Sequence, residues 1–340
     1  MLHINMISRG EEVKGQGVGT AYESLMDMLQ RLTSDDLALQ FNQLKGADLN
    51  HVHTVHPFCY EEMIRSSKPS CMHVHFLPET LEGSIALPSQ LQKMFYKYVL
   101  TVYRTADELI VVNPIFIDAL VDYGFDRDRI TFIPNVVDRQ TFKPLLSADR
   151  TIGYERYDLD PDRFTVLSVG QVQTRKGVLD FAEIARKMPD VQFLWAGDFS
   201  FGAITDGYEE LKKLRENPPE NLRFLGMVER SDMNLLYNIC DCLLMTSYNE
   251  LFPMAIIEAV NAGTPILLRD LDLYKEIYFT EYLRAANNDE FCDQLTRLAH
   301  DPALQLQAKI ASRKIATDYA EEKTAKRWVE YYQQFYERWG

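Results

Sequence analysis

The chain has few cysteines, no long apolar run and no basic half. Its five cysteines are odd in number and include no Cys-x-x-Cys pair, which argues against a disulfide framework and against a zinc or dithiol site. Uninterrupted apolar stretches stay well short of the ~18 residues that a membrane-spanning helix needs. The N-terminus enters an apolar strand pattern without a charged leader, so we expect a soluble, cytoplasmic protein in a reducing compartment.

The charge balance excludes a polyanion-binding surface that covers the whole molecule. The net charge is −14, with 14 basic and 19 acidic residues up to and including position 150 and 22 basic and 31 acidic residues after it. We therefore expect no nucleic-acid partner, and any contact with a membrane or anion must be a local patch. With 16 glycines and 14 prolines among 340 residues, the composition is neither fibrous nor disordered.

Short apolar runs alternate with segments of helical period, which predicts repeated βαβ units and parallel sheets. The expected strands are Ile4–Ile7, Val52–Val55, Met72–Phe76, Leu109–Val112, Thr131–Ile133, Thr165–Val169, Gln192–Ala196, Leu222–Leu225, Cys242–Met245 and Pro265–Leu268. The rhythm breaks between residues 143 and 163. The sequence thus predicts an α/β protein with two Rossmann-like, doubly wound domains, 1–150 and 151–322, and an aromatic C-terminal helix over 323–340 that bridges back to the first domain.

A glycine-rich turn follows the first strand and opens a helix, but its spacing fails the dinucleotide fingerprint, because Thr20 or Tyr22 stands where a third glycine or alanine belongs. The backbone near Gly17 can still approach a phosphate or a sugar. An ordinary tight turn is an equally good interpretation. Three Asp-x-Asp triplets, beginning at Asp126, Asp158 and Asp270, do not follow convincing strands and are interpreted as solvated turns, so we expect no metal site.

The segment Cys242–Leu267 carries the densest signal. An apolar strand is followed by a loop with polar and carboxylate side chains, and a proline then opens a helix whose first N–H groups face outward with the positive end of the helix dipole. The candidate ligand-binding residues of this loop and helix start are Ser247, Asn249, Glu250, Phe252, Pro253, Met254 and Ala255. Glu258 lies inside the same apolar helix, where a carboxylate needs hydrogen-bond donors such as ribose hydroxyls. An exposed helical glutamate is the plainer alternative.

A second loop, VGQVQTRKG, places Arg175 and Lys176 just before a helix. Two cations at a helix N-terminus oppose the helix dipole, an arrangement that makes sense when an anionic ligand binds there. A solvated turn is the alternative interpretation.

Residues 83–106 contain no acid and include a predicted helix over 88–105. Its cations Lys93, Lys97 and Arg104 stand among aromatic rings that include Phe95 and Tyr96. Cations mixed with aromatic side chains suit an anionic membrane interface. A packed helix whose lysine stems cover apolar surface fits the same pattern, and both interpretations stay open.

Taken together, these motifs resemble glycosyltransferase family four, a large family of retaining enzymes with the GT-B fold, in which two Rossmann-like domains face a cleft. The resemblance covers nearly the whole chain. It rests on the VGQVQTRKG loop, the turns Asn135–Asp138 and Phe224–Val228, and Glu250-x7-Glu258 followed by AxxAGTP. The first domain would then bind the acceptor and the second the nucleotide-sugar.

The resemblance also implies residue roles. Lys176, with its neighbours Gly170, Gln171 and Arg175, would hold the donor diphosphate, and Glu250 would contact the transferred sugar. The resemblance further assigns Glu258 to the ribose, the main chain near Val228 to the uracil, and His75 to the reacting sugar. Gln171 replaces a frequent family arginine and Pro253 replaces a frequent glycine, so the details of donor geometry can differ.

The opening of the chain and its acid-free helix resemble a bacterial subfamily that adds galactose to glucosyl-diacylglycerol. This implies a peripheral enzyme at the inner face of the cell membrane, which transfers galactose or glucose from a UDP-sugar to a glycolipid and forms an α-linked diglycosyl-diacylglycerol. We expect no cofactor and no metal requirement. Transfer to a soluble or polysaccharide acceptor, epimerisation of a UDP-sugar, and non-catalytic binding of a sugar nucleotide remain open alternatives.

Overall fold

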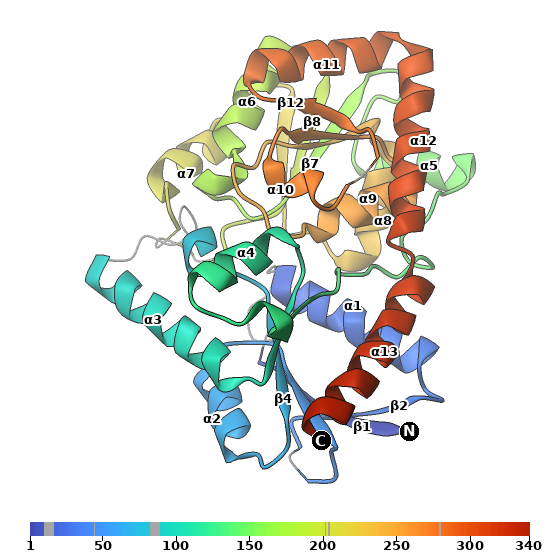
Figure 1. The fold of residues 1–340 in the computed structure, drawn as a ribbon. Coiled ribbons are helices and arrows are strands. Elements are labelled where there is room, and N and C mark those ends of the chain that lie inside the picture. The colour runs from blue at the N-terminus through green and yellow to red at the C-terminus, as the bar shows by residue number, and fades with distance from the viewer. Residues whose placement is uncertain (10–16, 44, 82–88, 201, 203–204, 279) are drawn as a thin grey trace. The chain divides into compact units, whose positions relative to one another are not determined.

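The computed structural model describes residues 1–9, 17–43, 45–81, 89–200, 202, 205–278 and 280–340. The described chain forms two compact units (Figure 1). Unit 1 takes in the chain as far as Asp138 together with Tyr319–Gly340, and unit 2 is Arg139–Asp318. The glycine-rich turn before Gly17 lies outside the described residues, and Gly17 is the first residue of a helix.

Unit 1 is built on a parallel six-stranded sheet with the order β2-β1-β3-β4-β5-β6. The strands are β1 Leu2–Ile7, β2 Leu37–Phe41, β3 Leu49–Val52, β4 Ser70–Val74, β5 Glu108–Val111 and β6 Ile130–Phe132. Every residue of β3, β4 and β5 is buried, as expected for the centre of a parallel sheet that is covered on both faces.

The strands β3 and β4 of unit 1 begin and end earlier than predicted, and one strand of unit 1 was not predicted at all. The third strand ends at Val52, where the predicted strand began. The prediction missed its earlier residues because Asn50 and His51 are polar side chains at buried positions. Such residues hide a strand from a search for apolar runs. β2 was missed because it lies at the sheet edge, and its residues after Leu37 are only partly buried.

The helices of unit 1 are α1 Gly17–Leu32, α2 Pro57–Arg65, α3 Ser89–Thr105, α4 Ile115–Asp122 and α13 Glu321–Trp339. The C-terminal helix α13 lies beside α1, although some 290 residues separate them in sequence (Figure 1). Its side chains Trp328 and Tyr332 are fully buried in one cluster with β1 and α1. Near its end, the Trp339 indole N–H donates to the buried carboxylate of Glu108 at 2.9 Å.

Unit 2 has a second parallel six-stranded sheet with the order β12-β11-β10-β7-β8-β9. Its strands are β7 Thr165–Val169, β8 Gln192–Ala196, β9 Leu222–Gly226, β10 Cys242–Met245, β11 Ile266–Arg269 and β12 Leu283–Ala285. Its helices are α5 Ser147–Arg156, α6 Val178–Lys187, α7 Tyr208–Glu216, α8 Arg230–Ile239, α9 Met254–Ala262, α10 Asp272–Lys275, α11 Asn288–His300 and α12 Pro302–Asp318. The three-residue edge strand β12 was not predicted.

The two units meet in sequence at residue 138, twelve residues before the boundary expected from composition. Residues 139–150 belong to unit 2 because their backbone is held by α8: the N–H of Lys143 donates to Asn234 and the N–H of Leu145 donates to Asn238. α5 continues this contact, since Gly153 packs directly against α8. These contacts span about ninety residues, so a local change of composition does not reveal them.

Among the described helices, none has both the length and the apolar content that crossing a bilayer requires.

Candidate functional site

The order of the strands in unit 2 points to the ends of β7 and β10. The chain runs from β7 outward to β8 and β9 on one side, and from β10 outward to β11 and β12 on the other. β7 and β10 are neighbours, so the connections that leave them diverge. A crevice forms outside the carboxyl ends of strands at such a point, and ligands of doubly wound sheets bind there. Both loops singled out in the sequence, 170–177 and 246–253, start at these two strand ends.

Gly177 allows the two loops to touch. Its backbone is left-handed, with φ of 67°, and a Cβ atom at this position would lie 2.2 Å from the carbonyl oxygen of Thr246. Only glycine therefore fits here. The Thr246 hydroxyl donates to the Gly177 carbonyl at 2.9 Å, and the Tyr248 N–H donates to the Arg175 carbonyl at 2.8 Å. The cationic loop and the carboxylate loop are thus joined by backbone contacts.

A buried ion pair lies between the loops. The Lys176 ammonium is 2.5 Å from the Glu250 carboxylate, and the two side chains are only 11% and 5% exposed. Burial lowers the pKa of Lys176, as does Arg175, while Glu250 acts in the opposite direction. Burial also opposes ionisation of Glu250, but Lys176 and Arg175 outweigh it and hold the pKa of Glu250 below its usual value. The lowered pKa keeps Glu250 ionised at neutral pH, opposite the Lys176 ammonium.

Arg175 reaches across to the same loop. Its guanidinium donates to the backbone carbonyl of Asn249 at 3.1 Å and to the side-chain oxygen of Gln173 at 3.2 Å. Gln173 is fully buried, and its other side-chain atom, Nε2, has no hydrogen-bond partner among the described residues. Arg175 thus has a fixed position next to Lys176, and two cations meet in one place.

The helix α9 begins beside this pair. Pro253 precedes its first turn with an extended backbone and provides no side-chain cap. The N–H of Ile256 donates to the Pro253 carbonyl, so the N–H groups of Met254 and Ala255 are the ones that the helix start offers to an anion. Met254 is buried, whereas Ala255 is partly accessible. The helix ends at Gly263, whose left-handed φ of 84° suits the last turn. Lys176, Arg175 and a helix start form a site suited to a diphosphate.

Glu258 is buried within α9, not exposed. The Tyr237 hydroxyl donates to one of its carboxylate oxygens at 2.7 Å, and the Arg230 guanidinium lies 3.4 Å from the other. Burial raises the pKa of Glu258, although Arg230 and Tyr237 favour its ionised form. One oxygen accepts from Tyr237, and the other lies 3.4 Å from a half-buried arginine, a distance that leaves room for a hydrogen bond from a ligand hydroxyl.

The other predicted residues of unit 2 follow the carboxyl ends of strands of the same sheet, most of them β7 or β10. Ser247 and Phe252 are buried, and the partly buried residues are Gly170, Gln171, Asn249 and Val228, of which Val228 follows β9. Sequence reasoning missed Tyr237 and Arg230. They lie seven residues apart on α8, directly after the Phe224–Val228 turn, and this helical spacing was the available signal.

In unit 1, His75 follows β4 and is buried, with Nε2 3.5 Å from Nδ1 of His53. Burial lowers the pKa of His75 to about 4, so the imidazole is neutral at pH 7. His75 belongs to unit 1, whereas the donor loops belong to unit 2. The roles that the resemblance implies for them remain predictions.

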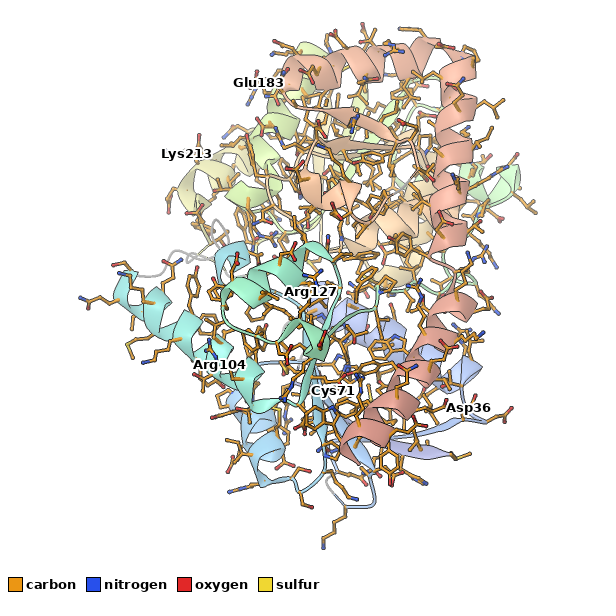
Figure 2. All side chains as sticks on the ribbon, viewed as in Figure 1. Asp36, Cys71, Arg104, Arg127, Glu183 and Lys213 are labelled. Atoms are coloured by element: carbon orange, nitrogen blue, oxygen red, sulfur yellow. The ribbon has the colours of Figure 1, made fainter. Side chains whose placement is uncertain are left out.

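The three cations of α3 all lie on its exposed side, while Val99, Val102 and Tyr103 are buried. Phe95 and Tyr96 are half-buried. Leu91 and Met94, which the prediction did not include, are 53% and 69% exposed. Arg104, labelled in Figure 2, also donates to the Tyr123 carbonyl and covers the Phe125 ring.

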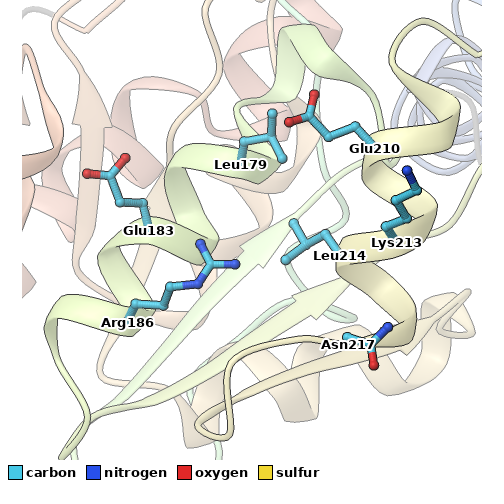
Figure 3. A pocket seen from close by; sticks show the side chains of 7 residues that line it. All are labelled: Leu179, Glu183, Arg186, Glu210, Lys213, Leu214 and Asn217. Atoms are coloured by element: carbon cyan, nitrogen blue, oxygen red, sulfur yellow. The ribbon is translucent and has the colours of Figure 1, made fainter.

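An open groove of about 440 Å³ lies between α6 and α7 in unit 2 (Figure 3). Charged side chains line it, among them Glu183, Arg186, Glu210 and Lys213, and none of the predicted ligand-binding residues does. The candidate site is therefore located by its chemistry and by the strand order, not by this groove.

Two glycosyltransferase family models match this chain. Residues 150–316 match the family described as Glycosyl transferases group 1, and residues 13–141 match Glycosyltransferase Family 4. The chain is 40% identical over 334 residues to the alpha-galactosylglucosyldiacylglycerol synthase of Streptococcus pneumoniae, an alignment that covers 98% of this chain and 89% of that protein. It is 26% identical over 262 residues to the processive diacylglycerol alpha-glucosyltransferase of Acholeplasma laidlawii, which covers 76% and 77% of the two chains.

Among solved structures, the Anabaena protein HepE in complex with UDP and glucose has a TM-score of 0.77 to this chain, with 16% sequence identity. The superposition covers 98% of this chain and all of HepE. At this identity the likeness concerns the fold.

Glu258 should make the free protein less stable at neutral pH. The carboxyl has a raised pKa in the folded state, so folding favours its protonated form, and its contribution to stability decreases as the pH rises through the folded pKa. Glu258→Gln should therefore raise the free energy of unfolding at pH 8, and the difference should disappear below the ordinary carboxyl pKa of about 4.3. Urea unfolding at pH 8 and pH 4 measures it.

The matched control is Glu216→Gln, an exposed position at the end of α7, which should have little effect at either pH. A Glu258→Gln variant that is less stable than wild type at pH 8 would show that Arg230 and Tyr237 outweigh the cost of burial.

Proposed function

This chain belongs to glycosyltransferase family 4, and we propose that it transfers galactose or glucose from a UDP-sugar to a glycolipid acceptor such as glucosyl-diacylglycerol, with retention of configuration. The predicted GT-B fold is confirmed by the two parallel sheets and by the likeness to solved GT-B enzymes, and the chain is a hexosyltransferase. The product of this reaction is an α-linked diglycosyl-diacylglycerol.

The main observation that supports binding of a UDP-sugar donor is the buried Lys176–Glu250 pair at the ends of β7 and β10. A UDP-sugar would place its diphosphate against Lys176, Arg175 and the start of α9. Ionised Glu250 would accept hydrogen bonds from hexose hydroxyls, and Glu258 from the ribose hydroxyls. The acceptor class rests on the near-complete alignment with the synthase of Streptococcus pneumoniae, whose name describes a galactosylated glucosyl-diacylglycerol product.

The reaction proceeds on the face from which the leaving group departs. The bond between the anomeric carbon and the diphosphate oxygen breaks, and its electron pair goes to that oxygen. The acceptor hydroxyl attacks from the same side and gives its proton to the diphosphate. Lys176, Arg175 and the helix start stabilise the charge that develops on the leaving group, which is where preorganised electrostatics lowers the barrier most. These cations supply the role that a divalent metal has in other glycosyltransferases, so we propose that the reaction needs no metal.

The deciding experiment incubates the purified protein with UDP-galactose or UDP-glucose, with and without glucosyl-diacylglycerol in detergent micelles. UDP release should require the lipid, and mass and linkage analysis should identify an α-linked diglycosyl lipid. Conversion of one UDP-sugar into another without acceptor would establish epimerisation. UDP binding without turnover on any acceptor would show that the protein is a non-catalytic sugar-nucleotide-binding module. Turnover with free sugars alone would overturn the glycolipid assignment.

Lys176→Met should lower kcat by about 10²–10³, the usual effect of removing one group that stabilises an oxyanion. The variant leaves Glu250 buried without its partner, so the double variant Lys176→Met with Glu250→Gln provides a charge-balanced version whose folding is tested by thermal unfolding. Lys187→Met is the matched control, because Lys187 sits on the adjoining helix in exposed ion pairs with Glu183 and Asp289.

The same assay tests metal independence. Magnesium or manganese should not raise the wild-type rate, and brief exposure to EDTA should not lower it. Loss of activity in EDTA that magnesium restores would contradict the proposal, as would a Lys176→Met enzyme with unchanged kcat.

We further propose that α3 places the enzyme on an anionic membrane surface. Lys93 and Lys97 are exposed along the same side of the helix as Met94, and Leu91 is exposed at its start. Such a mixture of cations and apolar side chains suits the headgroup region. Each cation contributes about 1 kcal/mol near an anionic surface, and salt screens this contribution.

Changing Lys93, Lys97 and Arg104 to Gln should therefore reduce binding to phosphatidylglycerol vesicles by roughly fivefold per cation at low salt, while UDP affinity stays unchanged. The Lys93→Gln, Lys97→Gln double variant leaves the Arg104 contacts intact. The control changes Lys309, Arg313 and Lys314 to Gln, three exposed cations on α12 with the same total charge. Equal sedimentation of all variants with vesicles would show that α3 is ordinary packed surface.

A further inference from the structure

Four histidines lie buried on one face of the sheet of unit 1. β3 and the residue after it carry His51 and His53, and β4 and the residue after it carry His73 and His75. The two strands are parallel neighbours, with His51 in register with Cys71. Side chains two residues apart on a strand share a face, so both His-x-His pairs point to the same side. Of the four, only His75 has a role implied by the family resemblance, and His51, His53 and His73 have none.

The imidazoles lie close enough to share one ion. His51 Nε2 is 3.3 Å from His73 Nδ1, and one nitrogen of each of His51, His53 and His73 lies within 4.8 Å of the others. Two nitrogens bound tetrahedrally to zinc at about 2.0–2.1 Å are about 3.3–3.4 Å apart. The first distance already matches this value, and the nitrogen of the third imidazole, which lies within 4.8 Å of the other two, would have to move closer by up to about 1.5 Å to reach it.

The hydrogen bonds around the cluster leave some of its ring nitrogens without a partner among the described residues. Nε2 of His53 and Nε2 of His73 are buried without a partner among the described residues. His51 is oriented from behind, because its Nδ1 is 2.7 Å from the Tyr332 hydroxyl. Histidines that bind metals use this kind of support, in which one nitrogen binds the ion and the other is held by a second residue. His75 contacts Nδ1 of His53 in a comparable way, at 3.5 Å.

The surroundings keep the donors neutral and dry. Tyr22 of α1 packs against His53 and Trp328 of α13 against His51, with ring centroids 4.8 and 5.1 Å apart. Burial lowers the pKa of each of the three imidazoles, which favours the neutral form that binds metals. Cys71, labelled in Figure 2, is a buried thiol on the same face beside His51, and burial raises the pKa of this thiol above its usual value.

We propose that His51, His53 and His73 bind one zinc ion, or another first-row transition metal that imidazole prefers, as a structural centre of unit 1. The ion would tie β3 and β4 to α13 through Tyr332. It would be enclosed by the core, so it would exchange only when unit 1 unfolds. It would therefore be separate from the donor chemistry and insensitive to a brief exposure to EDTA.

The test refolds the full chain from denaturant with a strong chelator or with zinc, followed by dialysis and metal analysis. The zinc-refolded protein should retain about one ion per chain, and its thermal unfolding midpoint should lie roughly 5–10 °C above that of the chelator-refolded protein. Refolding with cobalt should give the visible absorption of a tetrahedral nitrogen-bound centre. These readouts are independent of transferase activity.

His51→Gln, His53→Gln and His73→Gln should each lose the ion, whereas His3→Gln, an exposed histidine of the same unit, should retain it. Circular dichroism establishes which variants fold. If the variants do not fold, metal content and the cobalt spectrum of the wild-type protein decide the question alone. Wild-type protein without bound metal and with the same unfolding midpoint after both treatments would show that the histidines are packed core. Equal zinc content in His3→Gln and in the folded cluster variants would likewise show that His51, His53 and His73 do not bind the ion.

Discussion

A lysine and a glutamate held 2.5 Å apart and almost without water determine how the loops of unit 2 can be arranged. Burying either charge alone would cost several kcal/mol, so the loops after β7 and β10 must stay together for both side chains to remain ionised. Gly177 makes this approach possible, because any side chain there would collide with the Thr246 carbonyl. The loop spacing, the position of Arg175 and the start of α9 all follow from this pairing.

The two carboxylates of the same segment are in opposite electrostatic conditions. Glu250 has two cations beside it and its pKa is lowered, whereas burial dominates at Glu258 and its pKa is raised. The ionised form of Glu250 is therefore stabilised in the free protein. At Glu258, the neighbouring groups offset only part of the cost of burying the ionised carboxylate. A ligand that donates hydroxyl hydrogens to Glu258 would provide that compensation. A raised carboxyl pKa in a crevice is a common mark of a binding site, since the fold accepts a cost there that only the ligand removes.

Most of the site in unit 2 could be predicted from sequence, because its signals are local. A strand, a loop with Glu250, a proline and an apolar helix lie within one short segment, and the glycine and cation pattern of the other loop is equally compact. The partners of Glu258 could not be predicted in this way. Tyr237 is 21 residues away and reaches the carboxylate only because α8 and α9 pack together. The unit boundary near residue 138 depends on still longer contacts.

The fold of unit 1 shows a second limit of apolar patterns. Buried histidines at His51 and His73 occupy core positions of central strands, so the hydrophobic run that marks a parallel strand is interrupted there. The spacing His-x-His on two strands was a readable signal, but one sequence does not show that the strands are adjacent. Their register supplies that information.

The placement of positive charge accounts for how an acidic protein could handle two anionic partners. With a net charge of −14, the surface as a whole repels both a nucleotide diphosphate and an anionic lipid surface. In unit 2, Lys176 is nearly buried and Arg175 is partly buried, so their attraction acts at short range, with reduced screening, on an anion that approaches the ends of β7 and β10. On α3 the cations are exposed, so their attraction is long-ranged, additive and sensitive to salt. The first arrangement suits stabilisation of a leaving group, and the second suits reversible attachment. An enzyme with the proposed function, which returns its product to a membrane and takes a new donor from solution, would need both, and the acidic remainder of the surface would restrict membrane contact to α3, which lacks acidic residues.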